Sequence, residues 1–250
     1  MGGLITDLKT GLAFCTRLPI VLAAPASGAD IARTSWTFPL IGVLVGALGA
    51  LVYWLTDTLG VHPFVSGSLA LGSTVFATGC LHEDGLADMA DGFGGGATLE
   101  RKLEIMRDSR IGSYGASALV LSLMVRVGAI ASLSDPALVA PALIAAHAGG
   151  RATIPLFMAF VPRARADGLA AEAGRASMRS VAAAGALGAI ILAVCLGFSG
   201  VLIAMLLVAV AIVLLARLCL TQIGGQTGDV LGAVEQVSEI LILLVAAAWL

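Results

Sequence analysis

Charged side chains are scarce in this sequence of 250 residues, since Asp, Glu, Lys and Arg together make up 12% of it. Hydrophobic residues make up 59%, which is more than a soluble domain of this size needs for its core. They fall in long runs, and this predicts a chain that crosses a membrane several times. The formal net charge is −2, so there is no basic excess that would favour nucleic acid as a partner.

Cysteine is also rare. The four cysteines form no Cys-x-x-Cys pair and lie in or beside apolar runs: Cys15, Cys80, Cys195 and Cys219. This pattern predicts buried thiols and argues against a disulfide framework or a zinc site. The apolar run near residue 20 is short and is interrupted by Arg17 and Pro19. We therefore expect the N-terminus to be retained and not cleaved as a signal peptide.

Seven apolar runs predict membrane-spanning helices. They cover residues 36–55, 63–81, 112–133, 137–160, 181–198, 201–221 and 229–249. An all-α, polytopic membrane helix bundle follows, with residues 1–250 forming a single integral membrane domain. Three segments of this domain are distinct. Residues 1–34 form an N-terminal interfacial segment with an amphipathic helix. Residues 82–110 form a cytoplasmic active-site segment that is both acidic and basic and contains a second amphipathic helix, and residues 222–240 form a glycine-rich turn with a polar helix start.

Basic residues predict the orientation. Arg and Lys gather before the first span, in residues 82–110 and in residues 161–180, whereas the turns on the other side contain none. The positive-inside rule places these segments, and the glycine-rich turn 222–228, in the cytoplasm with the N-terminus, and the C-terminus outside. Because the acid-rich and glycine-rich motifs all fall on that side, an enzyme is favoured over a conduit.

Four acids occur within nine positions, namely Glu83, Asp84, Asp88 and Asp91. In a helix the three aspartates stand at i, i+4 and i+7, within a wedge of roughly 60° on one face. Carboxylates so close repel one another unless they hold a cation, and oxygen ligands suit Mg²⁺. Acids at a helix N-terminus are the alternative, but capping alone does not explain the glycines on both sides of the stretch.

Residues 98–115 predict an amphipathic helix followed by a glycine-containing turn. Arg107 and Arg110 are candidates for phosphate contacts, since arginine suits forked hydrogen bonding to phosphate oxygens. Asp108 is a candidate to join the metal cluster. The alternative is that the face shared by Arg101, Glu104 and Asp108 forms a set of i, i+4 ion pairs.

Residues 224–239 combine a glycine-rich turn with acids that continue into the last span. Free N–H groups at a helix start form an anion site, although the lysine of a P-loop is absent. Capping explains Asp229 as well as metal binding does, but it does not explain Glu235 and Glu239, which should face a polar cavity. The charged or polar residues inside other spans should also face the bundle interior, and these are Arg126, His147 and Arg151. We expect His147 to be structural.

Together these motifs resemble the cobalamin synthase family (CobS or CobV), the membrane enzymes of late vitamin B12 assembly. The resemblance is carried by His82-Glu83-Asp84-Gly85-Leu86-Ala87-Asp88-Met89-Ala90-Asp91-Gly92, by residues 105–115 and by residues 224–233. It implies Mg²⁺-dependent transfer from adenosylcobinamide-GDP to α-ribazole or its 5′-phosphate, with release of GMP. It also implies a multi-pass protein of the bacterial cell (inner) membrane with a cytoplasmic active site.

These considerations give the following predicted roles. Catalysis is assigned to Asp84, Asp88 and Asp91, and Mg²⁺ binding to Asp84, Asp88, Asp91, Asp108 and Asp229. Substrate contacts are assigned to His82, Glu83, Arg107, Ser109, Arg110, Tyr114, Arg151, Gly225, Thr227 and Glu235. The predicted partners are the two substrates and the lipid bilayer, while a homo-oligomer and an association with other cobalamin-assembly enzymes stay open.

Two other functions remain as alternatives. A CDP-alcohol lipid phosphotransferase shares the start Asp88-Met89-Ala90-Asp91-Gly92, but the Ala-Arg expected next is replaced by Phe93-Gly94. A metal-ion transporter would use the acids as a cation site, and it would need ionisable residues along a path through several spans.

Overall fold

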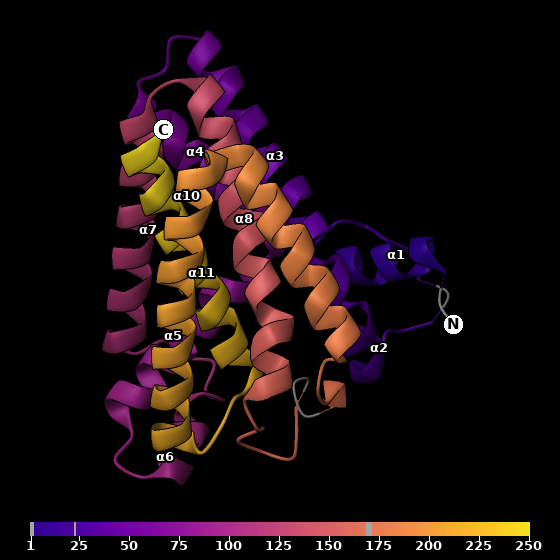
Figure 1. Ribbon diagram of the computed structural model, residues 1–250. Coiled ribbons are helices and arrows are strands. Elements are labelled where there is room, and N and C mark those ends of the chain that lie inside the picture. The colour runs from indigo at the N-terminus through magenta and orange to yellow at the C-terminus, as the bar shows by residue number, and fades with distance from the viewer. Residues whose placement is uncertain (1–2, 23, 169–171) are drawn as a thin grey trace.

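The protein folds as a bundle of helices (Figure 1), which confirms the predicted all-α class. The computed structural model describes residues 3–22, 24–168 and 172–250. Its helices are α1 (Leu4–Cys15), α2 (Gly28–Thr34), the short η1 (Ser35–Thr37), α3 (Phe38–Thr58), α4 (Pro63–Thr78), α5 (Leu81–Gly95), α6 (Leu99–Ile105), α7 (Ser113–Leu133), α8 (Pro136–Phe160), α10 (Met178–Ile223) and α11 (Gly228–Trp249).

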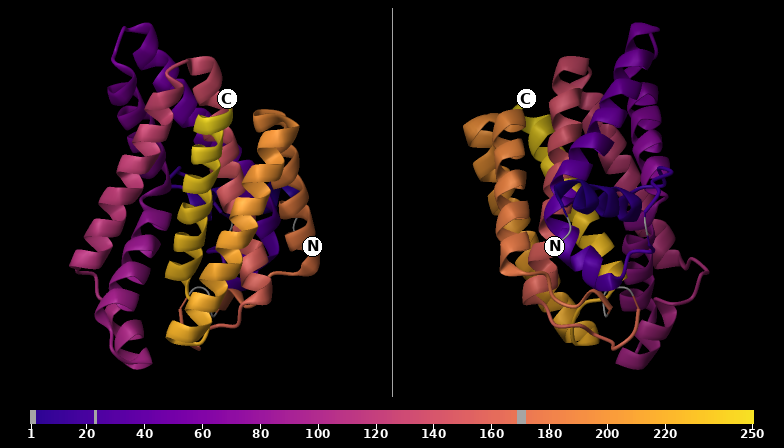
Figure 2. Two further views of the ribbon diagram at one scale, coloured as in Figure 1. Left: turned by 60° about the vertical axis from the view of Figure 1, so that its left-hand side comes forward. Right: turned by 90° about the vertical axis from the view of Figure 1, so that its right-hand side faces the viewer.

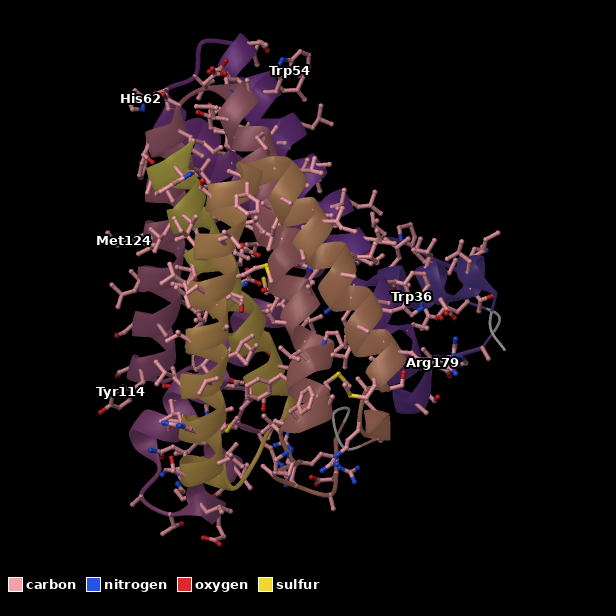
Figure 3. The ribbon with its side chains drawn as sticks, viewed as in Figure 1. Trp36, Trp54, His62, Tyr114, Met124 and Arg179 are labelled. Carbon is pink, nitrogen blue, oxygen red and sulfur yellow. The ribbon has the colours of Figure 1, made fainter. Side chains whose placement is uncertain are left out.

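Five of the described helical segments are long and apolar enough to cross a membrane, and the bent pair α4–α5 makes a sixth if it counts as one span. Helix α10 counts once in that number, although its 46 residues double back at Gly197, where φ is 70°. Figure 1 shows its two orange arms meeting near the top. With the arms taken separately, six of the seven predicted apolar runs correspond to helices, and the run 63–81 is divided by a break at Gly79 and Cys80. Large apolar side chains point outward, among them Met124 at 67% exposure (Figure 3).

The second span breaks inside the bundle. Gly79 and Cys80 both adopt the left-handed conformation, with φ of 66° and 59°, and α5 leaves α4 at an angle of 88°. The N–H of Arg17 donates to the carbonyl of Ala77 at 2.7 Å, so the N-terminal segment covers the break. The sequence predicted an uninterrupted span 63–81 followed by a polar segment outside the bundle. Instead α5 packs against α7 and α11, because its first turn is polar and finds buried partners there.

The N-terminal segment is more helical than predicted. Helix α1 fits the predicted amphipathic helix over residues 3–18, but the segment 23–34, predicted as a connection, contains α2. A capping box starts α2, since Ser27 accepts from the N–H of Asp30 and Asp30 accepts from the N–H of Ser27. Arg33 pairs with Asp7 of α1. Figure 2 shows this indigo segment lying across one side of the bundle.

Helices α3 and α8 approach each other closely through glycines. A Cβ at Gly42 would lie 2.3 Å from the carbonyl oxygen of His147, and one at Gly46 would lie 2.6 Å from that of Leu143. Glycine at this spacing lets backbones meet. The contact fixes α8, which carries Arg151 into the centre of the bundle.

Replacing Gly42 by Ala should therefore destabilise the bundle. The new methyl group meets backbone, which cannot move aside without separating two helices, and overpacking of this kind costs about 1–3 kcal/mol. The matched control is Gly72→Ala in α4, where no heavy atom lies within 4 Å of the added Cβ. Thermal unfolding of both variants in one detergent measures the difference. Equal midpoints would contradict this account of the α3–α8 contact.

Candidate active site

A cavity of about 270 Å³ lies between α5, α8, the start of α11 and the N-terminal segment. Its polar wall contains His82, Asp84, Arg165 and Asp229. The rest of its lining is mostly apolar and includes Phe14, Ile31, Phe38, Ile154, Met158, Ala173 and Leu231. These residues come from α1, α2, α3, α8, α11 and the segment before α10. The lining therefore combines charged residues with an apolar wall whose side chains form no hydrogen bonds.

Three of the predicted acids gather at the charged side. Asp84 and Asp88 lie on α5, and Asp229 lies in the first turn of α11. The two helices touch where a Cβ at Gly85 would be 2.6 Å from the carbonyl oxygen of Asp229. The half-buried carboxylate of Asp88 lies in the field of Asp84, Asp229 and Asp91. Like charges held this close favour a cation between them.

Arg165 is a site residue that the sequence analysis did not single out. Its Nη2 lies 3.7 Å from Oδ2 of Asp229, and its charge also acts on Asp88. Its Nη1 is buried without a hydrogen-bond partner. In the sequence it was one of several basic residues in 161–180, and nothing in its spacing distinguished it.

The glycine-rich turn positions Arg165. The N–H of Gln226 donates to the carbonyl of Pro162 at 2.8 Å, and the N–H of Ala164 donates to that of Gln226 at 2.9 Å. A Cβ at Gly225 would lie 2.3 Å from the carbonyl oxygen of Pro162, so only glycine fits. Thr227 caps α11 by accepting from the N–H of Val230. Gly225 and Thr227, predicted as substrate contacts, thus hold the loop and the helix start.

Asp91 makes a different contact from its neighbours on the same helix. Its carboxylate accepts from the N–H groups of Gly112 and Gly115 at 2.7 and 2.8 Å, at the beginning of α7. A Cβ on either glycine would lie within 2.4 Å of a carboxylate oxygen. Asp91 therefore joins the end of α5 to α7, which explains the two glycines at the end of the segment 98–115, the second motif.

The remaining residues of the second motif lie on the exposed side. Asp108 pairs with Arg110 at 2.6 Å, and these hydrogen bonds lower the pKa of the Asp108 carboxyl to about 2. Arg107 pairs with Asp167 at 2.6 Å. Ser109 is exposed, and the ring of Tyr114 lies over Gly94. On the helix face of the alternative interpretation, Arg101 does pair with Glu104, whereas Asp108 pairs with Arg110 outside the predicted spacing. The predicted roles of these residues toward a metal or phosphate stay predictions.

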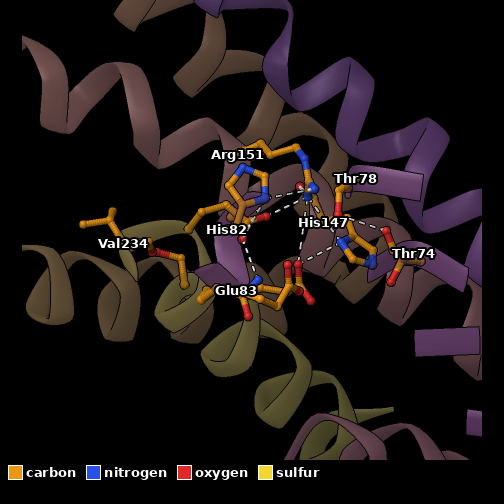
Figure 4. A network of polar contacts seen from close by, with 12 residues as sticks. Thr74, Thr78, His82, Glu83, His147, Arg151 and Val234 are labelled. Atoms are coloured by element: carbon orange, nitrogen blue, oxygen red, sulfur yellow. Dashed lines mark hydrogen bonds and ion pairs between the residues drawn. The ribbon is translucent and has the colours of Figure 1, made fainter. Parts of the chain in front are cut away.

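Below the cavity lies a buried network of charged residues (Figure 4), formed by His82, Glu83, Arg126, His147, Arg151, Glu235 and Glu239. Arg126 Nη1 lies 3.1 Å from Oε1 of Glu83 and 3.0 Å from Oε1 of Glu239. Arg151 Nη1 lies 2.6 Å from Oε1 of Glu235. His147 Nδ1 lies 2.8 Å from Oε2 of Glu239. As predicted, the charges inside the spans face the bundle interior.

This network supports the first turn of α5. Glu83 and His82 both belong to it, and they stand directly before Asp84. Helices α7, α8 and α11 supply their partners, so the acid face of α5 is fixed by three other helices.

Atoms of His147, Glu235 and Glu239 lie close enough to hold a metal ion. The Arg151 guanidinium, however, already lies between Glu235 and His147 at 2.6 and 3.2 Å.

Comparisons with known proteins identify the family of this chain. The family model described as CobS, cobalamin-5-phosphate synthase, matches residues 7–247. A protein of Bradyrhizobium diazoefficiens named adenosylcobinamide-GDP ribazoletransferase is 54% identical over 98% of this chain and 94% of its own. Proteins of the same name from Mesorhizobium japonicum and Azorhizobium caulinodans are 48% and 43% identical, over 98% and 96% of this chain and 93% and 95% of theirs. No solved structure matches. The chain belongs to the cobalamin-5-phosphate synthase (CobS) family.

Proposed function

We propose that this protein is a membrane transferase that joins adenosylcobinamide-GDP to α-ribazole or its 5′-phosphate and releases GMP. The observation that carries the proposal is that Asp84, Asp229 and Arg165 line one cavity, with Asp88 one helical turn after Asp84 and within the field of both acids. Family membership and the name of the relatives support the same reaction. The positive-inside pattern supports placing this site at the cytoplasmic face of a bacterial inner membrane.

The acid cluster fits Mg²⁺ by its chemistry. The charges of Asp84 and Asp229 both act on the carboxylate of Asp88, and Arg165 Nη2 lies 3.7 Å from Asp229. Hard oxygen donors suit Mg²⁺, which keeps several waters and also binds substrate phosphates. Asp84, Asp88 and Asp229 would hold the ion, which supplies charge neutralisation on the diphosphate. For Asp91 we propose a positioning role, because its oxygens accept the N–H groups that start α7.

The chain's own groups account for the transfer. A ribose hydroxyl of the acceptor attacks the phosphorus on the cobinamide side, a new P–O bond forms, and the P–O bond to GMP breaks. Arg165 lines the cavity beside Asp229, so its guanidinium supplies positive charge as negative charge moves to the leaving GMP. The hydroxyl proton passes to a carboxylate oxygen of the cluster that does not hold the ion.

Purified protein in lipid or detergent should release GMP only when both adenosylcobinamide-GDP and α-ribazole are present. EDTA should abolish release and added Mg²⁺ should restore it. Chromatography of the nucleotide product measures both results. Release of CMP from a CDP-linked donor would favour the lipid phosphotransferase, and cation flux into proteoliposomes without any nucleotide product would favour the transporter.

A further inference from the structure

The two sides of the cavity differ in a way that the acid cluster does not explain. The apolar wall contains an aromatic pair, since Phe14 of α1 stacks on Phe38 of α3 with ring centroids 5.7 Å apart and planes at 16°. Phe38 is fully buried behind it, and Ile154 and Met158 of α8 are almost so. Phe14 keeps part of its surface open and lines the cavity. A wall of this kind suits a flat apolar ring.

We propose that this wall binds the aromatic base of the acceptor nucleoside, an inference that rests on the proposed function. The base would lie against Phe14, with Ile154 and Leu231 around it. Its ribose would reach the charged side at Asp84 and Arg165. The N-terminal segment then serves in substrate recognition and not only in contact with the membrane interface.

Size and polarity select this occupant among the parts of the two substrates. At about 270 Å³ the cavity is near the lower limit for a small-ligand site, roughly 300 Å³, and a corrin macrocycle does not fit. Guanine carries donors and acceptors on its edges, and the apolar wall offers them no partner. Leaving them unpaired is unfavourable. A methylated benzimidazole has a hydrocarbon edge and no N–H once it is linked to ribose, so an apolar wall suits it.

Phe14→Ala tests the assignment in two ways. In equilibrium dialysis without donor, α-ribazole binding should weaken about tenfold or more, as expected for the loss of an aromatic contact. In steady-state assays the KM for α-ribazole should rise while the KM for adenosylcobinamide-GDP stays within twofold. The preference for α-ribazole over a nucleoside with unmethylated benzimidazole should also decrease, which a general loss of structure would not cause. The matched control is Phe76→Ala in α4, whose ring is 79% exposed on the outer surface.

The outcomes separate this inference from the proposed function. Normal GMP release with an unchanged KM for α-ribazole in Phe14→Ala would overturn the inference and leave the function intact. A raised KM for the donor, or displacement of bound α-ribazole by guanosine, would assign the wall to guanine and also overturn it. Binding of α-ribazole that depends on Phe14, without any GMP release, would support the inference and refute the function. Neither binding nor release would refute both. Should Phe14→Ala not fold, Leu231→Ala gives the same test from α11.

Discussion

Asp88→Asn should lower kcat for GMP release about 100- to 1,000-fold, as does the loss of other groups that stabilise transition-state charge. Asp88 is half-buried at the centre of the acid cluster, between Asp84 and Asp229. An amide keeps the shape of the side chain but removes its charge, so the cluster loses affinity for Mg²⁺. Raising the Mg²⁺ concentration should recover part of the rate, and a Mg²⁺ titration of initial velocity measures this.

The matched control is Glu100→Gln in the first turn of α6, where an exposed carboxylate becomes an amide away from the cavity. It should turn over at the normal rate. Asp88→Asn protein that inserts, unfolds at the wild-type temperature and still reacts as fast as wild type would remove Asp88 from the site.

Arg126→Met should produce the largest loss of stability. Arg126 is fully buried in α7, and its Nη1 bridges Glu83 and Glu239 at 3.1 and 3.0 Å. Removing one partner of a buried ion pair leaves the other charge uncompensated and costs about 3–5 kcal/mol. Because Glu83 precedes Asp84, the acid face of α5 should also lose its alignment. A thermal unfolding midpoint and the Mg²⁺ dependence of GMP release measure the two effects.

An exposed pair provides the comparison for Arg126. Arg101 and Glu104 of α6 lie 2.7 Å apart with side chains 57% and 69% exposed. Such pairs contribute little because solvent screens them, so Arg101→Met should leave the midpoint unchanged. Adding Glu239→Gln to Arg126→Met should recover part of the stability, since it removes a carboxylate that has lost its partner. Unfolding of Arg126→Met at the wild-type temperature would show that the network does not hold α5.

Hydrophobic periodicity predicted the helices well because each one must bury an apolar face or present it to lipid. It failed at two places where local polar chemistry decides the backbone. The capping box of Ser27 and Asp30 starts α2 within a segment rich in Pro, Ser and Gly. The break at Gly79 and Cys80 turns α5 toward the partners of Glu83, and those partners lie on other helices. Sequence spacing contains no information on such tertiary contacts.

The candidate site was predicted only in part, because some of its residues are brought together by tertiary contacts. Asp84 and Asp88 share a helix face, so their proximity follows from helical spacing, and the glycine-rich turn indicated Asp229. Arg165 lies in a loop, and only the pairing of that loop with Gln226 brings it to the cluster. The interior charges were expected to face inward, but their pairing into one network could not be read from spacing.

The bend between α4 and α5 has a consequence for access. The apolar half-helix α4 occupies one end of this position in the bundle, and α5, with its acids, occupies the other (Figure 1). A reactant that enters at this position therefore meets ionisable groups from one end only, because the apolar half closes the other end. One broken helix thus supplies both a reactive end and a closed end, which two separate helices would otherwise have to provide.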